Sequence, residues 1–123
     1  MKPCTGGRIV IVDDVADTRC VVEEVLKLGG YTNFVSYENP LIALEEIGRN
    51  TRPAIVITDF NMPGMNGLDL LAGIESRHPG IEALIITGDP LQLADQTRYH
   101  VIGKGPGFTK RILEYVRQVI VEA

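Results

Sequence analysis

Short runs of apolar, mostly β-branched residues alternate with longer amphipathic stretches along this chain, and this alternation limits its fold more than any other feature. The clearest run is Ile55 to Thr58, which ends abruptly on Asp59. The turn residues Pro63, Gly64 and Gly67 then separate it from the next stretch. A continuous apolar run between turn residues is typical of a strand buried on both faces, as in parallel sheets. Five strand–helix alternations predict an α/β fold, a doubly wound five-stranded parallel sheet with helices on both faces.

The boundaries of these elements follow from apolar periodicity and from capping residues. Asn39-Pro40 and Asp89-Pro90 each combine a side-chain cap with proline at the first helical position. Strands are expected at residues 8–12, 32–37, 55–59, 83–86 and 101–104, and helices at residues 17–28, 40–47, 68–77, 91–98 and 108–121. The first helix is expected to face the sheet with Val21, Val22, Val25 and Leu28, and the last with Phe108, Ile112, Val116, Val119 and Ile120.

Length and charge exclude several classes of protein. A chain of 123 residues predicts one domain, at residues 8–123, after a flexible lead-in at residues 1–7. The net charge of −4 without a basic patch disfavours direct nucleic-acid binding. Cys4 and Cys20 have neither metal-ligand spacing nor a disulfide pattern, and no run is long enough to span a membrane. These features predict a cytoplasmic protein.

Polar residues follow four of the expected strands. They are Asp13 and Asp14, then Asp59, then Thr87, and finally Lys104. Because parallel strands end at one edge of the sheet, these side chains are expected to meet in one site. Carboxylates held close together resist simultaneous ionisation, and a divalent cation relieves their repulsion. Oxygen ligands with room for water suit Mg²⁺.

The remaining groups suit phosphate chemistry. Thr87 offers a hydroxyl donor, and Lys104 offers a compact positive charge on a flexible stem. A carboxylate placed among a metal ion, a hydroxyl and an ammonium can become an acyl phosphate. Taken singly, each residue has a structural explanation. Asp59 could start a turn, and Asp13 and Asp14 could cap the following helix. Thr87 could be a strand-end hydroxyl bonded to the backbone, and Lys104 a solvated surface lysine. A shared site explains the four positions together better than four separate coincidences do.

The chain resembles the response-regulator receiver domains of two-component signalling from about residue 8 to residue 121. The matching pieces are Ile11-Val12-Asp13-Asp14, Arg19, the stretch from Thr58 to Gly67 with its Asp-x-x-Met-Pro-x-x-x-Gly motif, Ile85-Ile86-Thr87, and Lys104. The resemblance implies a flavodoxin-like fold with strand order 2-1-3-4-5. It implies that Asp59 accepts phosphate from a histidine kinase or a histidine phosphotransfer protein.

The same resemblance assigns roles around Asp59. Asp14, Asp59 and the backbone carbonyl of Asn61 would bind Mg²⁺, with Asp13 helping through water. Thr87 would move toward the phosphate, and Lys104 would bind it. Phosphorylation would then alter binding to a downstream target protein or an attached domain, in a protein that is not an enzyme beyond its own phosphorylation and dephosphorylation.

Three positions depart from the family pattern. Gly105 separates Lys104 from Pro106, whereas proline usually follows the lysine directly. Val101 takes the place of the aromatic switch residue, with Tyr99 out of register, and Gly88 replaces the usual alanine after the threonine. A Thr-Gly pair of this kind is similar to the receivers of hybrid histidine kinases.

Two alternative functions remain open at this point. One is a receiver-like interaction scaffold with impaired switching. The other is a small phosphatase of the haloacid-dehalogenase type, although Asp59-Phe60-Asn61 lacks that family's second acid. The sequence leaves undecided whether the domain acts alone or within a larger protein.

Overall fold

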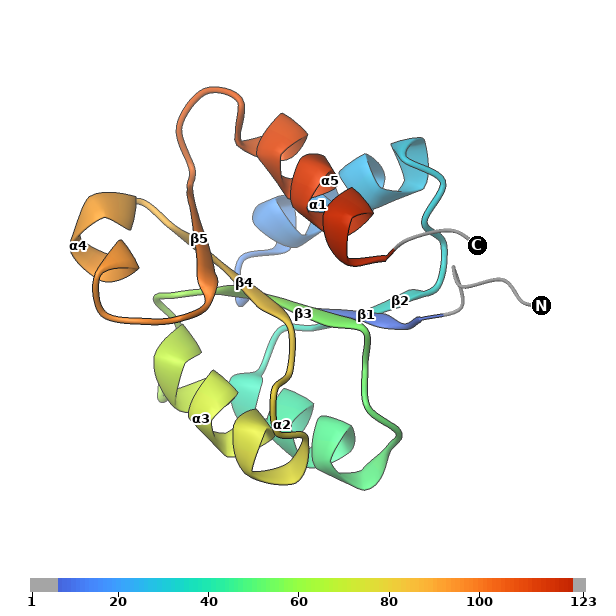
Figure 1. The fold of residues 1–123 in the computed structure, drawn as a ribbon, viewed down its shortest axis with the longest axis vertical. Helices are drawn as coiled ribbons and strands as arrows, with labels where there is room; N and C mark the ends of the chain where they lie inside the picture. Colours follow the sequence, from blue (N-terminus) through green and yellow to red (C-terminus); the bar gives the residue numbers. More distant parts are fainter. Residues whose placement is uncertain (1–6, 121–123) are drawn as a thin grey trace.

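A five-stranded parallel sheet lies between two layers of helices (Figure 1). The structure is a computed structural model that describes residues 7–120. Its elements are β1 Ile9–Val12, α1 Ala16–Leu28, β2 Phe34–Tyr37, α2 Pro40–Arg49, β3 Ile55–Asp59, α3 Gly67–Arg77, β4 Ala83–Thr87, α4 Pro90–Ala94, β5 His100–Gly103 and α5 Phe108–Val119. The strand order is β2-β1-β3-β4-β5, which confirms the predicted fold class. No helix in the described residues has the length and hydropathy needed to cross a membrane.

Residues 1–6 and 121–123 lie outside the described part of the chain. The predictions that fall there are most of the lead-in, the environment of Cys4, and the last predicted residue of the C-terminal helix, Val121. Gly7, which is described, precedes β1, and the amide of Ala54 donates a hydrogen bond to the carbonyl of Arg8 over 2.8 Å. The chain is therefore already hydrogen-bonded to the segment before β3 at residue 8.

Successive residues of each strand feed two separate cores, because side chains alternate between the faces of a sheet. α1 and α5 cover one face, and α2 and α3 cover the other (Figure 1). The first core takes Ile9, Ile11, Ile55, Ile57, Leu84, Ile86 and Ile102 from the strands. The second takes Val10, Val12, Val56, Ala83 and Ile85. Double coverage explains why these strands are apolar throughout rather than alternating with polar residues.

Strand register brings the carboxyl ends of the strands to one edge of the sheet. β1 pairs with β3 so that Val12 lies opposite Thr58, and β3 pairs with β4 so that Asp59 lies opposite Ile86. Thr87 in turn lies opposite Gly103 in β5. The residues that follow these strands therefore start from neighbouring positions.

The inward face of α1 differs from the prediction. Val22 and Leu26 are fully buried and Val25 is partly buried, whereas Val21 is 39% exposed and Leu28 is 86% exposed. The prediction for Val21 and Leu28 was therefore wrong. Val22 and Leu26 are four residues apart and share one helix face, while Leu28 is the last residue of the helix and lies off that face.

Two further elements differ from the prediction near the C-terminus. β5 begins and ends one residue early, which leaves Lys104 in the loop after the strand, and α4 spans five residues. Tyr115 of α5 is buried although the periodicity did not include it. Its hydroxyl lies 3.0 Å from Oε1 of Glu82 and 3.2 Å from the carbonyl of Ala83, so its polar atom has partners at the sheet.

Candidate functional site

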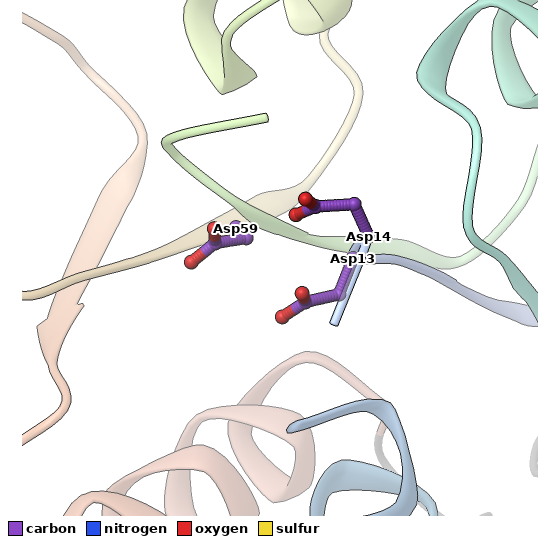
Figure 2. Close-up of side chains that lie close together, drawn as sticks. All are labelled: Asp13, Asp14 and Asp59. Atoms are coloured by element: carbon purple, nitrogen blue, oxygen red, sulfur yellow. The ribbon is translucent and has the colours of Figure 1, made fainter. Parts of the chain in front are cut away.

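Three carboxylates meet at the carboxyl ends of the neighbouring strands β1 and β3 (Figure 2). One oxygen from each of Asp13, Asp14 and Asp59 lies within 4.8 Å of the other two. Asp13 is 2% exposed and Asp59 is 4% exposed, while Asp14 is half-buried. The sequence therefore predicted correctly which acids come together. Charges this close and this poorly hydrated repel one another strongly.

The backbone around Asp59 explains why small residues follow it. The amide of Phe60 donates to the carbonyl of Ile86 over 2.9 Å, and the amide of Gly67 donates to the carbonyl of Phe60 over 2.8 Å. A Cβ atom on Gly67 would lie 2.8 Å from the backbone oxygen of Asp59, closer than real Cβ atoms come. Gly64 has a φ of 84°, in the left-handed region that favours glycine. This loop can fold tightly against Asp59 because glycine occupies both positions.

Asp13 is held from two sides. Its Oδ1 accepts a hydrogen bond from the amide of Val15 over 2.9 Å, and its carbonyl accepts one from Nη1 of Arg19 over 2.7 Å. Burial raises the pKa of Asp13 above its usual value, and the charges of Asp59 and Asp14 raise it further. The hydrogen bond from Val15 and the ammonium of Lys104 act in the opposite direction. Burial and the neighbouring carboxylates together therefore disfavour the charged form of the Asp13 carboxyl.

Lys104 contacts the cluster despite the changed loop. Its Nζ lies 2.8 Å from Oδ1 of Asp59, and its side chain is 37% exposed. The backbone amide of Lys104 donates to the carbonyl of Thr87 over 2.9 Å, which continues the pairing of β4 with β5. The peptide bonds in the described chain are all trans, so the lysine reaches Asp59 without a cis proline after it. Gly105 does not prevent this contact.

Thr87 and Asn61 line a hollow near this edge of the sheet. Thr87 is 3% exposed, and its hydroxyl accepts a hydrogen bond from the amide of Asp89 over 3.1 Å. Asn61 is exposed. Thr87, Asn61 and Asp89 line a cavity of about 250 Å³ together with Phe60, Leu93 and Gln96. The cavity therefore has a mixed polar and apolar lining, and two of its residues, Phe60 and Asn61, directly follow Asp59 in the chain.

The sequence did not reveal a polar cluster that surrounds Tyr99. The Tyr99 hydroxyl donates to Oε1 of Glu75 over 2.9 Å, and Arg98 contacts the same carboxylate while its Cζ lies 4.3 Å from the centre of the Tyr99 ring. Oε2 of Glu75 accepts from the amide of Gly80 over 2.6 Å. Val101, at the family's switch position, packs in the core under α2 and α3. No sequence pattern links Glu75 with Tyr99, which are 24 residues apart.

The donor set at this edge of the sheet fits a magnesium ion. Three carboxylates offer hard oxygen ligands, and Asp14 and Lys104 both reach solvent, so the site is open to water and phosphate. Among the described residues, this group of ligands consists of carboxylates alone, without cysteine or histidine. Such a group is a poor match for zinc or copper.

Comparison with known proteins identifies the family. Residues 9–104 match the response regulator receiver domain. The chain belongs to this family and is a receiver domain of the two-component response regulators. Domains of this family generally bind Mg²⁺ at an acidic pocket, and in this chain the pocket corresponds to the Asp13, Asp14 and Asp59 cluster.

The most similar relatives include a transcriptional regulator and a chemotaxis protein. The chain is 38% identical over 81 residues to the DNA-binding transcriptional regulator NtrC of Escherichia coli, covering 66% of this chain and 17% of that protein. It is 34% identical over 82 residues to the chemotaxis protein CheY1 of Helicobacter pylori, covering 65% of this chain and 66% of that protein. A receiver domain protein from Clostridium thermocellum superposes with a TM-score of 0.79 at 21% identity, covering 93% of this chain and 94% of the other, which supports the fold.

Proposed function

We propose that this domain accepts a phosphoryl group on Asp59 from a phosphohistidine, in a reaction that requires Mg²⁺, and that phosphorylation changes its affinity for a downstream protein or an attached domain. The donor would be a histidine kinase or a histidine phosphotransfer protein. One observation carries the proposal: Asp59 is buried within the acid cluster, with the ammonium of Lys104 2.8 Å from its Oδ1. The chemistry is that of a cytoplasmic signalling module.

The transfer balances with the groups present. A carboxylate oxygen of Asp59 forms a bond to phosphorus, the bond between phosphorus and the imidazole nitrogen breaks, and the imidazole leaves with the electron pair and takes up a proton. Lys104, which contacts Asp59, would hold a phosphoryl oxygen, and the Thr87 hydroxyl, which accepts from the amide of Asp89, would donate its own proton to another. Asp14, Asp59 and the Asn61 carbonyl would hold Mg²⁺, with Asp13 acting through water. The ion would supply positive charge that neutralises the charge developing during transfer.

The two alternative functions receive less support. A scaffold with impaired switching was suggested by the inserted Gly105, but Lys104 still contacts Asp59. A haloacid-dehalogenase-type phosphatase needs a second acid two residues after its nucleophile, and Asn61 stands at that position, exposed. The relatives described above are a transcriptional regulator and a chemotaxis protein, which supports a signalling role. We therefore place the domain among phosphoacceptors that act on no substrate other than themselves.

Intact-mass spectrometry after incubation with acetyl phosphate and Mg²⁺ tests the proposal. We expect a single phosphoryl adduct on the unaltered domain and no adduct on Asp59→Asn. Excess chelator should abolish the adduct, because the repulsion within the cluster then opposes a further negative group. Asp69→Asn is the matched control, since Asp69 is an exposed acid in the first turn of α3.

Two results would refute this assignment. One is an adduct that persists in Asp59→Asn, and the other is an adduct that forms equally well in chelator. Steady turnover of a phosphate ester by the unaltered domain would instead favour the phosphatase alternative.

A further inference from the structure

A shallow groove of about 420 Å³ lies at the N-terminal end of α2, beside the acid cluster. We call it the α2 groove. Its walls come from three separate segments: the end of β1, the start of α2 and the loop between β3 and α3. It is lined by Asp14, Glu38, Pro40, Leu41, Ile42 and Pro63.

The apolar part of the α2 groove contributes little to the core of the domain. Leu41 is 58% exposed and Ile42 is 51% exposed, although α2 already buries Ala43 and Ile47 against the sheet. Pro63, on the opposite wall, is also exposed. Adjacent large apolar side chains that a fold leaves in water, inside a concave surface, are typical of contact sites for another molecule.

The charges of the groove select the kind of molecule. Asp14 and Glu38 line it, and none of the described residues that line it is basic. The helix N-terminus does not favour an anion here, because Oδ1 of Asn39 accepts from the amide of Leu41 over 2.8 Å and from that of Ile42 over 3.3 Å, and Pro40 has no amide proton. The groove therefore combines an apolar floor with an acidic rim.

We propose that the α2 groove is a docking site for a partner protein that presents a short amphipathic helix, with a leucine or isoleucine for the apolar floor and an arginine or lysine for Asp14 and Glu38. The apolar contacts would supply most of the affinity, and the ion pairs would orient the helix. The groove shares Asp14 with the proposed metal site, so a basic side chain of the partner and Mg²⁺ would compete for that carboxylate, whereas the other groove residues take no part in the phosphorylation of Asp59. Failure of docking would leave the reaction with acetyl phosphate unchanged.

A nuclear magnetic resonance titration of the ¹⁵N-labelled domain tests this proposal in the presence of chelator. The probe is a capped peptide helix that presents two leucines and two arginines along one face, and the comparison peptide carries glutamate in place of arginine. We expect the first peptide to shift the amide signals of Glu38, Leu41 and Ile42. The glutamate peptide should bind at least about tenfold more weakly, because its charges oppose those of the rim.

Variants of the groove sharpen the test. Leu41→Gln with Ile42→Gln should weaken binding by about fivefold or more, since both remove apolar area from the contact. Leu28→Gln and Leu91→Gln are matched controls, because these leucines are 86% and 85% exposed on α1 and α4. Glu38→Gln should weaken binding by about threefold and reduce its dependence on salt. Thermal unfolding of each variant verifies that the domain still folds.

Three outcomes would overturn the proposal. Equal binding of the two peptides would show that the acidic rim does not select a basic partner. Equal losses of affinity in the groove variants and the leucine controls would show that the peptide does not bind in the groove. If the domain alone self-associates with rising concentration, and the Leu41 and Ile42 variant abolishes this association, the groove is an interface between copies of this chain instead.

Discussion

The two halves of the candidate site differ in how firmly the fold holds them. The acidic half consists of Asp13, Asp14 and Asp59 at the ends of β1 and β3, and every residue of these two strands is buried. The switch half consists of Thr87 at the end of β4, Gly88 after it, and Lys104 and Gly105 after β5. β5 lies at the edge of the sheet, its first residue is exposed, and Lys104 is 37% exposed.

This difference separates the chemistry of the domain from its response. The backbone of the acidic half is held by the pairing of β1 with β3 and by the close approach of Gly67 to Asp59. In the switch half, a Cβ atom on Gly88 or Gly105 would meet nothing within 4 Å. We infer that the acidic half binds the metal ion and carries the phosphorylated Asp59, whereas the loops of the switch half contact the phosphate and change conformation.

The largest expected effect concerns the acidic half. Asp14→Ala should weaken Mg²⁺ binding at least about tenfold, because Mg²⁺ binds directly to one or two carboxylates. Asp13→Ala should weaken it less, since Asp13 is assigned a contact through water. Both variants should unfold at higher temperature than the unaltered domain in chelator, because they relieve repulsion. Calorimetric titration with Mg²⁺ measures the affinities, with the exposed acid of α1 as the control, Asp17→Ala. Equal losses at Asp13 and Asp14 would reverse the assignment.

The second effect tests whether the two halves are electrostatically linked. Lys104→Met removes the cation beside Asp59 and should lower the free energy of unfolding in chelator by about 1 kcal/mol, a modest value because Lys104 is partly exposed. Added Mg²⁺ should restore more stability to this variant than to the unaltered domain. Urea unfolding with and without Mg²⁺ measures both terms, and Lys110→Met on the surface of α5 is the control. An unchanged stability in chelator would mean that the ion pair contributes nothing.

The third effect concerns the response of the switch half. Beryllofluoride, a phosphate mimic, should shift the amide signals of the non-proline residues in the loops 87–90 and 104–107, with smaller changes at Tyr99 and Val101. Thr87→Ala should reduce the shifts in these loops by about half or more while leaving Asp59 open to phosphorylation, because the hydroxyl contact that distinguishes the two states is lost. Thr51→Ala is the control at an exposed loop position. Fixed signals at Gly88 and Gly105, together with a large change at Tyr99, would contradict this account.

The smallest effect concerns the cluster of Glu75, Arg98 and Tyr99, which holds the start of β5 against α3. The hydrogen bond from Gly80, followed by that from Tyr99, lowers the pKa of Glu75 below its ordinary value of 4.5. Its contribution to stability is therefore present above about pH 4.5 and is lost as the pH falls through the lower folded value. Burial, and then the hydrogen bond to Glu75, raises the pKa of Tyr99 above 10.0. Its contribution is present below pH 10 and is lost as the pH rises through the higher folded value.

Hydrogen exchange of the Tyr99 amide across pH measures this cluster. After correction for the intrinsic pH dependence of exchange, protection should be constant between about pH 5 and pH 9 and should fall outside that range. Glu75→Gln should remove the fall on the acid side, whereas the exposed-surface control Glu114→Gln should retain it. Protection that is independent of pH in the unaltered domain would show that the cluster does not hold β5.

Much of the acidic half could be predicted without coordinates. A buried strand needs apolar residues on both faces, so the ends of β1 and β3 can be recognised where the apolar runs stop at Asp13 and Asp59. Parallel strands place those ends at one edge of the sheet. The same argument placed Thr87 and Lys104 nearby. The roles of Asn61, Thr87 and Lys104 in phosphate and metal binding stay predictions, because their tests require the ions themselves.

The sequence by itself determined the alternation of strands and helices and the gathering of polar residues at one edge of the sheet, since these follow from apolar patterns and from the geometry of parallel sheets. The strand order came from the resemblance to receiver domains, and the structure has that order. Tertiary structure decided the exact inward face of α1, where Leu26 is buried and Leu28 is exposed. It also paired Glu75 with Tyr99, and it left Leu41 and Ile42 exposed beside Glu38. These features depend on where helices and loops distant in sequence come to rest against one another. Packing sets those positions, and no local pattern along the chain encodes them.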